Sequence, residues 1–188
     1  VGHSWGGPIV RVAAAADRAR IRGLVLVDPS DEHADAYFSP AAAWQFAATR
    51  ALIPALARLG LYRLLGSRPG GVQPADVAAD HRAEDFTVVA ARATAAELRP
   101  FLGDLRALRA RPLDLGDLPV TVISGTRMGF LDRAVRAAIV AAHRQTVASL
   151  ANARFVAAPD SGHLIPFSEP DLIVAEILRL IPQRASPR

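Results

Sequence analysis

Cysteine and lysine are both absent from this 188-residue sequence. Without cysteine, the chain can form neither disulfide bonds nor thiolate metal sites. Without lysine, its formal net charge of +4 rests on arginines, which are interleaved with acidic residues along the chain. A protein that binds nucleic acid through its phosphates typically gathers its basic residues into a patch. We therefore expect no nucleic-acid partner.

Long apolar runs are missing as well, although 51% of the residues are apolar. No run is long enough to span a bilayer, so we expect no transmembrane segment. The sequence shows no secretory signal peptide either, which favours a cytoplasmic protein; a signal peptide upstream of Val1 stays open. The apolar content is sufficient for one domain with a real core.

Three short apolar runs, each followed by a turn signal, have the character of strands covered on both faces. They are Gly23–Asp28, Pro119–Ser124 and Ala153–Ala158. Helical patterns alternate with these runs over Pro8–Ala19, Arg133–Leu150 and Asp171–Leu180. Ser168-Glu169-Pro170-Asp171 before the last helix has the pattern of a capping box. Alternating strands and helices predict an α/β fold with a parallel sheet flanked by helices.

The segment between the first two predicted strands is too long for an ordinary βα connection. It contains alanine-rich helical runs over Ser39–Leu65, broken by Pro54 and Gly60, and over Pro74–Arg111, broken near Arg99-Pro100, with a loop at Gly66–Gly71 between them. We predict an inserted helical subdomain over 30–115, with 1–29 and 116–188 forming the core. A membrane-surface helix over Ala51–Leu65 is the alternative for the first run; a packed helix is the commoner arrangement.

Gly2-His3-Ser4-Trp5-Gly6 matches G-x-S-x-G, which places a nucleophilic serine on a sharp turn between a strand and a helix. Such a turn strains the serine backbone, and we expect Gly2 and Gly6 to be required sterically. The N–H of Trp5 would lie at the amino end of the following helix, where backbone donors and the helix dipole stabilise an oxyanion. Only Val1 precedes the motif, so we expect the strand that leads into it to lie largely outside this chain.

A serine nucleophile needs a base, and the sequence has five histidines. His163 directly follows the third predicted strand, and loops at the carboxyl ends of parallel strands share the edge that also carries Ser4. An imidazole there could take the serine proton and return it to the leaving group. His33, His81 and His143 lie in helical or cap segments without a supporting pattern and are interpreted as surface or packing residues.

These motifs resemble the C-terminal portion of an α/β-hydrolase-fold protein. The sequence "GHSWGG" is similar to the nucleophile elbow, "LVLVDP" to the next strand, and "SGHLIPFSEPDLI" to the histidine loop and final helix. The inserted helices resemble the cap, or lid, of many members. The resemblance covers the whole chain and implies that the N-terminal strands, and the loop that usually supplies a second oxyanion donor, are missing from it. By itself, the chain is expected to be poorly active.

The resemblance leaves the third residue of the triad open. Many family members carry the acid three positions after the residue that corresponds to Gly125, where this sequence has Met128. Others carry it at the end of the strand after the elbow, which is Asp28 here. We favour Asp28, with Asp132 as the main alternative and Asp160 or no acid as the others.

The sequence thus predicts a serine hydrolase that cleaves an ester or similar acyl bond of a small or lipophilic substrate, using Ser4, His163 and Asp28. His3, Phe38, Trp44 and Tyr62 are expected to line the substrate pocket. No metal and no organic cofactor are implied, and the oligomeric state is not indicated. The alternative is a catalytically inactive hydrolase-fold protein that binds a ligand. One fold hosts many reactions, so the bond type stays open.

Overall fold

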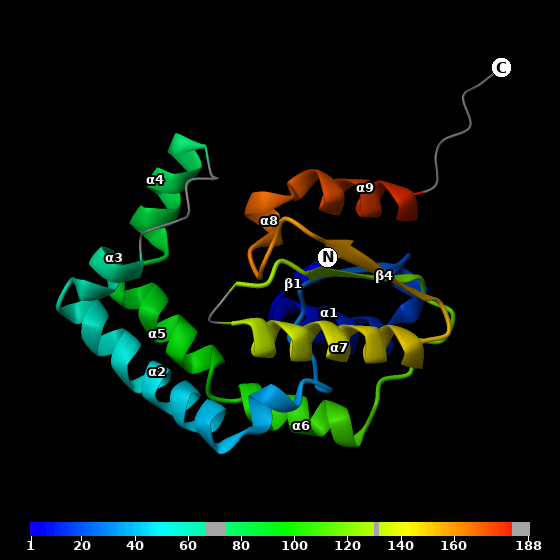
Figure 1. Cartoon of the computed structure of the whole chain (residues 1–188), viewed down its shortest axis with the longest axis horizontal. Coiled ribbons are helices and arrows are strands. Elements are labelled where there is room, and N and C mark those ends of the chain that lie inside the picture. The colour runs from blue at the N-terminus through cyan, green and yellow to red at the C-terminus, as the bar shows by residue number, and fades with distance from the viewer. Residues whose placement is uncertain (67–73, 130–131, 182–188) are drawn as a thin grey trace. The chain divides into compact units, whose positions relative to one another are not determined.

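The structure is a computed structural model that describes residues 1–66, 74–129 and 132–181 (Figure 1). The loop predicted at Gly66–Gly71 lies outside the described residues except for Gly66. The chain forms two compact units. The first comprises Val1–Ala36 together with Leu108–Arg188, and the second comprises Tyr37–Ala107.

The first unit is built on a parallel sheet of four strands in the order β1-β2-β3-β4. They are β1 (Gly2–His3), β2 (Leu24–Val27), β3 (Val120–Gly125) and β4 (Ala153–Ala158). Leu26 pairs with Gly2 on one side and with Val122 on the other. The predicted α/β fold is confirmed, and the three predicted strands match β2, β3 and β4 to within a residue at each end. All four carboxyl ends face the same edge of the sheet, because the strands are parallel.

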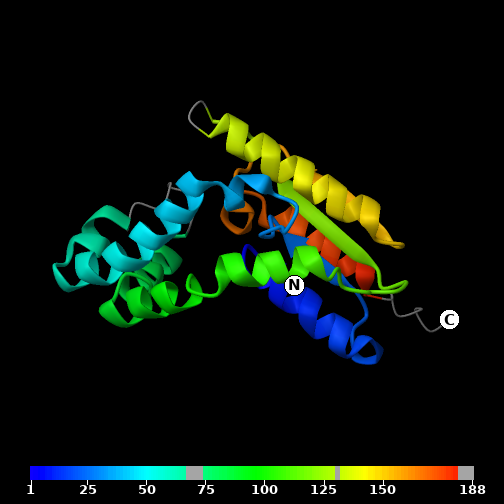
Figure 2. The same ribbon diagram turned by 90° about the horizontal axis from the view of Figure 1, so that it is seen from below.

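Helices cover both faces of this sheet (Figures 1 and 2). The helices α1 (Gly6–Ala16) and α7 (Arg133–Ser149) lie on one face, and α8 (Ile165–Ser168) and α9 (Pro170–Leu180) on the other. Side chains of β2 alternate between the faces: Leu24 and Leu26 pack towards the α1 and α7 side, while Val25 and Val27 pack with α9. Two apolar layers therefore hold the strands in place, as the apolar runs predict.

The predicted capping box at α9 is wrong. The N-cap residue is Glu169, no side chain caps the helix, and Ser168 instead ends α8. The Ser168 hydroxyl donates to the carbonyl of Leu164 at 3.1 Å and contacts the hydroxyl of Ser161. The Glu169 carboxylate accepts a hydrogen bond from Ser161 at 2.5 Å. Ser168, the expected capping residue, therefore binds the loop that precedes it instead of the first turn of α9.

The second unit holds helices and, in its described part, no strand. Its helices are α2 (Pro40–Arg58), α3 (Leu61–Gly66), α4 (Ala75–Glu84), α5 (Val88–Glu97) and most of α6 (Phe101–Ala110), and a 3₁₀ turn (Asp35–Phe38) leads into it. The predicted break at Gly60 is confirmed by a φ of +72° there. The break predicted at Pro54 is wrong, because α2 continues through it. Packing of α2 along α5 offsets the lost hydrogen bond.

No helix in the described ranges is both long enough and apolar enough to cross a bilayer. This agrees with the absence of long apolar runs from the sequence.

Gly6 and Gly7 offer a matched pair for a stability prediction. A Cβ on Gly7 would lie 2.4 Å from the Cβ of Pro29, whereas a Cβ on Gly6 would meet nothing within 4 Å. The prediction that Gly6 is required sterically is thus wrong, and the steric requirement for glycine is at Gly7. We expect Gly7→Ala to lower the free energy of unfolding by about 1–3 kcal/mol through overpacking. Gly6→Ala, at the start of α1, is expected to raise it by up to about 1 kcal/mol. Urea unfolding of both variants measures this, and an equal loss in both would contradict it.

Candidate active site

Ser4 lies immediately after β1 in a strained backbone conformation, with a φ of +53°. Its N–H donates to the carbonyl of Val27, and its own carbonyl accepts hydrogen bonds from the N–H groups of Gly7 and Ser30. A Cβ on Gly2 would lie 2.5 Å from the carbonyl oxygen of Gly6, so the turn needs glycine at position 2. The backbone therefore forms the strand-turn-helix geometry that the motif predicts, with a half-buried serine at the turn.

Trp5 is the N-cap residue of α1. Its N–H group lies at the amino end of that helix, where backbone donors and the helix dipole favour negative charge. The geometry fits the predicted oxyanion role of the Trp5 N–H. The role itself stays a prediction.

Asp28 lies directly after β2 and is also in the left-handed region, with a φ of +39°. Its carboxylate is buried and accepts hydrogen bonds from three different elements. His163 Nδ1 lies 2.7 Å from Oδ2, an Arg136 guanidinium nitrogen lies 2.8 Å from both oxygens, and the Gly125 N–H donates to Oδ1 at 3.0 Å. Burial raises the pKa of Asp28, but the hydrogen bonds from His163 and Arg136 and the Arg136 charge outweigh it. The net pKa lies below its ordinary value, so the carboxylate is ionised at neutral pH.

His163 lies in the loop between β4 and α8, and its side chain is 46% exposed. One ring nitrogen faces Asp28. The His163 carbonyl accepts a hydrogen bond from His3 Nε2 at 2.9 Å, and the two imidazole rings lie 4.8 Å apart. Among the described residues, no hydrogen bond joins the Ser4 hydroxyl to the His163 ring. Catalytic hydrogen bonds are often long in unliganded enzymes, so the separation is compatible with a serine–histidine pair.

Gly125 allows the histidine loop to lie against the end of β3. A Cβ at this position would lie 1.9 Å from the carbonyl oxygen of Gly162, a distance that no side chain tolerates. The Arg127 N–H donates to the carbonyl of Ser161 and fixes the same loop. The loop therefore approaches Asp28 because a glycine ends β3.

The two alternative acids lie elsewhere. Asp132 is the exposed N-cap residue of α7, and Asp160 is an exposed residue of the turn after β4. Across the described residues, neither carboxylate bonds to the His163 ring. The structure thus brings Asp28 to His163 and leaves Asp132 and Asp160 at the surface.

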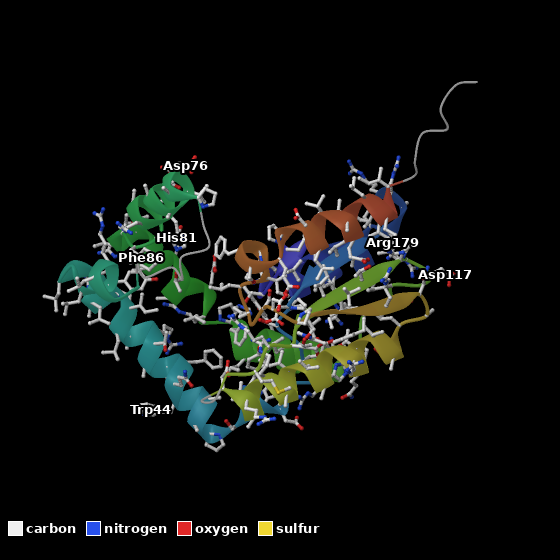
Figure 3. All side chains as sticks on the ribbon, turned by 45° about the horizontal axis from the view of Figure 1, so that its top comes forward. Trp44, Asp76, His81, Phe86, Asp117 and Arg179 are labelled. Atoms are coloured by element: carbon white, nitrogen blue, oxygen red, sulfur yellow. The ribbon has the colours of Figure 1, made fainter. Side chains whose placement is uncertain are left out.

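Three of the four predicted pocket residues belong to the second unit, and His3 belongs to the first. Trp44 projects from α2 with 74% of its surface exposed (Figure 3). The Tyr62 ring packs against Phe86 at 5.2 Å, and Phe38 lies under the Arg106 guanidinium. Participation of these aromatic residues in a substrate pocket stays a prediction. A separate cavity of about 140 Å³ lies at the amino ends of the strands, lined by residues that include Gly23 and Val25.

One polar face of α7 was missed by the sequence interpretation. Apolar Val135 is 51% exposed, whereas Arg136, His143 and Thr146 of the same helix are buried. They bond, in turn, to the Asp28 carboxylate, the Pro29 carbonyl and the Asp31 carboxylate. Their spacing of seven and three residues places them on one helix face, and this is the signal that could have found them.

His143 is fully buried and is neither a surface residue nor a purely apolar packing residue. Its Nε2–H donates to the carbonyl of Pro29 at 2.8 Å, so Nδ1 accepts from the Ser124 hydroxyl at 2.7 Å. Burial lowers the pKa of His143, and the neutral ring satisfies both contacts. The His143 ring therefore links Ser124 of β3 to Pro29, the residue after Asp28.

The buried state of His143 predicts acid sensitivity. The folded protein keeps this ring neutral, whereas the unfolded chain binds a proton below about pH 6.5. The stability that His143 contributes is therefore present above that pH and lost as the pH falls below it. We expect the free energy of unfolding to drop between about pH 7.5 and 5.5, and His143→Gln to flatten this dependence. Urea unfolding at both pH values measures it; an identical dependence in the variant would contradict it.

Within the described part of the chain, one group of side chains has ligand atoms close enough together for a metal ion. It consists of Asp31, Glu32 and His33, whose ligand atoms lie within 4.8 Å of one another. These atoms already have partners. Asp31 accepts from His33 and Thr146, and Glu32 pairs with Arg11 at 2.6 Å. The cluster is explained by these internal contacts.

Most of the first unit and the inserted helices match a known family. A sequence profile described as "Alpha/beta hydrolase family" matches residues 1–176. The chain belongs to the α/β-hydrolase family. None of the curated proteins matches the chain significantly.

Solved α/β-hydrolase structures share the fold at low identity. A haloalkane dehalogenase from Agrobacterium tumefaciens matches with a TM-score of 0.65 and 14% identity, over 95% of this chain and 65% of that one. An esterase from Thermogutta terrifontis matches with a TM-score of 0.55 and 21% identity, over 95% and 63%. An α/β hydrolase from a Medee basin deep-sea metagenome library matches with a TM-score of 0.56 and 16% identity, over 100% and 66%. This α/β-hydrolase chain spans less than two thirds of the length of each.

Proposed function

We propose that the intact protein is a serine hydrolase in which Ser4 is the nucleophile, His163 the general base and Asp28 the acid that orients it. The observation that carries the proposal is the 2.7 Å contact between His163 Nδ1 and Asp28 Oδ2. Asp28 directly follows β2, and Ser4 directly follows β1, the strand that pairs with β2. Asp28 holds Nδ1 protonated, which leaves Nε2 unprotonated and able to accept the serine proton.

The proposed reaction proceeds through an acyl-enzyme. Ser4 Oγ attacks the substrate carbonyl while His163 Nε2 takes its proton, and the carbonyl oxygen becomes an oxyanion beside the Trp5 N–H. His163 then protonates the leaving group, and water attacks the acyl-enzyme by the same route. The Asp28 carboxylate stabilises the imidazolium formed in each half-reaction.

An ester or similar acyl compound is the proposed substrate class, because a serine nucleophile with a histidine base suits acyl transfer. The second unit carries exposed apolar side chains, including Trp44 and Leu59, and is the proposed lid over a small or lipophilic substrate. The alternative is a hydrolase-fold protein that binds a ligand without turning it over; it draws on the absence of a Ser4–His163 hydrogen bond among the described residues.

Labelling by a fluorophosphonate probe separates the two functions. We expect the intact protein to be labelled covalently, and His163→Ala to lose labelling by at least about 10³-fold, because an unactivated serine is a weak nucleophile. His81→Ala, in the second unit, serves as the matched control and is expected to label normally. A protein that stays unlabelled while folded would favour the ligand-binding alternative.

A further inference from the structure

Arg136 makes a contact that the proposed triad does not account for. It lies in the first turns of α7, is only 6% exposed, and places one guanidinium nitrogen 2.8 Å from each oxygen of Asp28. Its Nε is buried without a hydrogen-bond partner among the described residues. Burying a guanidinium with an unpaired N–H is costly, so the Asp28 contact is the interaction that compensates for its position.

The contact restricts how the Asp28 carboxylate can rotate. Oδ1 accepts from Gly125 and Arg136, and Oδ2 accepts from Arg136 and His163. Because Arg136 binds both oxygens, rotation of the carboxylate away from His163 would break a charge-assisted hydrogen bond. The Gly125 N–H alone holds only Oδ1 and would leave Oδ2 freer to turn.

We propose that Arg136 is a positioning residue for the proposed hydrolase: it clamps the buried Asp28 carboxylate so that Oδ2 stays on His163 Nδ1. This inference rests on the proposed function. Arg136 touches neither the substrate nor Ser4 in this mechanism and acts only through Asp28. It also supplies the positive charge that keeps a buried carboxylate ionised.

The charges around Asp28 predict how the loss of Arg136 changes the pH dependence. The titratable or charged groups that face Asp28 are His163 from the loop after β4, Arg136 and His143 from α7, and His3 from β1. Without the Arg136 cation, the cost of burying the Asp28 carboxylate is compensated less, so the pKa of Asp28 rises. The acid limb of the pH profile therefore moves to higher pH.

Arg11 provides a matched control. It is 4% exposed, pairs with the buried carboxylate of Glu32, and also has a buried Nε without a hydrogen-bond partner in the described residues. Arg11→Met removes a buried ion pair of the same kind, but it leaves Asp28 untouched. Comparing Arg136→Met with Arg11→Met separates an effect on the triad from a general loss of stability.

The first readout is the rate of fluorophosphonate labelling of the intact protein as a function of pH. We expect Arg136→Met to slow labelling at neutral pH by about 10²-fold and to move the acid limb to higher pH. Arg136→Lys, which keeps the charge, is expected to recover most of the rate. Arg11→Met is expected to leave the limb in place. In Asp28→Asn, adding Arg136→Met is expected to cost little more, because both changes act on one contact.

The second readout is independent of catalysis. A proton held between His163 Nδ1 and Asp28 gives a low-field NMR resonance, which we expect to disappear or broaden in Arg136→Met and to persist in Arg11→Met. If the native protein is not labelled, but its low-field resonance is lost in Arg136→Met and kept in Arg11→Met, the hydrolase proposal fails while the clamp holds. The clamp is overturned if the resonance and the acid limb stay unchanged in Arg136→Met, or if both arginine variants change them equally. Should Arg136→Met fail to fold, Arg136→Gln takes its place and is judged by the same criteria, with Arg136→Lys again expected to resemble the unmodified protein.

Discussion

Replacing Ser4 by alanine is expected to lower kcat for hydrolysis of a p-nitrophenyl ester by the intact protein by about 10⁶-fold, with little change in stability. Removal of the nucleophile in a serine protease has an effect of that size. The Ser4 hydroxyl makes no hydrogen bond to another described residue, so its loss leaves no buried partner unpaired. The strained φ of +53° is also no worse for alanine than for serine.

Ser149→Ala is the matched control for this experiment. Ser149 lies at the end of α7, and its hydroxyl donates to the carbonyl of Thr146 one turn earlier. We expect the esterase activity of Ser149→Ala to be unchanged. Ester hydrolysis that survives in Ser4→Ala would show that another group performs the attack.

Asp28→Asn is expected to reduce kcat by about 10⁴-fold, because an amide at this position favours the wrong tautomer of His163. The carboxylate now accepts hydrogen bonds from His163, Arg136 and Gly125, and an amide nitrogen cannot accept from any of them. The variant also loses the partner of a buried cation. Part of its effect is therefore expected as a lower free energy of unfolding, by about 3–5 kcal/mol.

Asp132→Asn distinguishes the two candidate acids. Asp132 is exposed at the start of α7, and its side chain makes no capping hydrogen bond. We expect its kcat to change by less than about tenfold. Steady-state kinetics of both Asn variants, each at a temperature where it is fully folded, measures the difference. A large loss in Asp132→Asn with a small one in Asp28→Asn would assign the acid to the loop after β3.

The sheet could be predicted because its signals are local. Apolar runs such as Leu24–Val27, bounded by turn residues, indicate buried parallel strands without any knowledge of their neighbours. Helix ends were predicted less well where tertiary contacts decide them. Ser168 has the spacing of a capping residue, yet it bonds backward to Leu164. Pro54 usually breaks a helix, yet α2 packs along α5 and continues through it.

The residues of the candidate site likewise divide into those that a local signal predicts and those that depend on tertiary contacts. Ser4 and His163 could be proposed from motif and position, and Asp28 from the end of a strand. Arg136 was not proposed. Its spacing from His143 and Thr146 indicates a shared helix face, but an arginine in a helix is usually solvated, and its burial here depends on a carboxylate 108 positions away in the sequence. The close approach of Gly125 to Gly162 likewise depends on how two strand ends meet in space.

Peptide mapping of the fluorophosphonate adduct tests the central claim most directly. The intact protein is labelled and digested with a protease that cleaves after arginine. Sequencing of the peptides by mass spectrometry then assigns the adduct to one residue. The proposed mechanism predicts the adduct on Ser4, in the peptide that begins at or before Val1 and ends at Arg11. An adduct on another serine, such as Ser30 or Ser161, would contradict it.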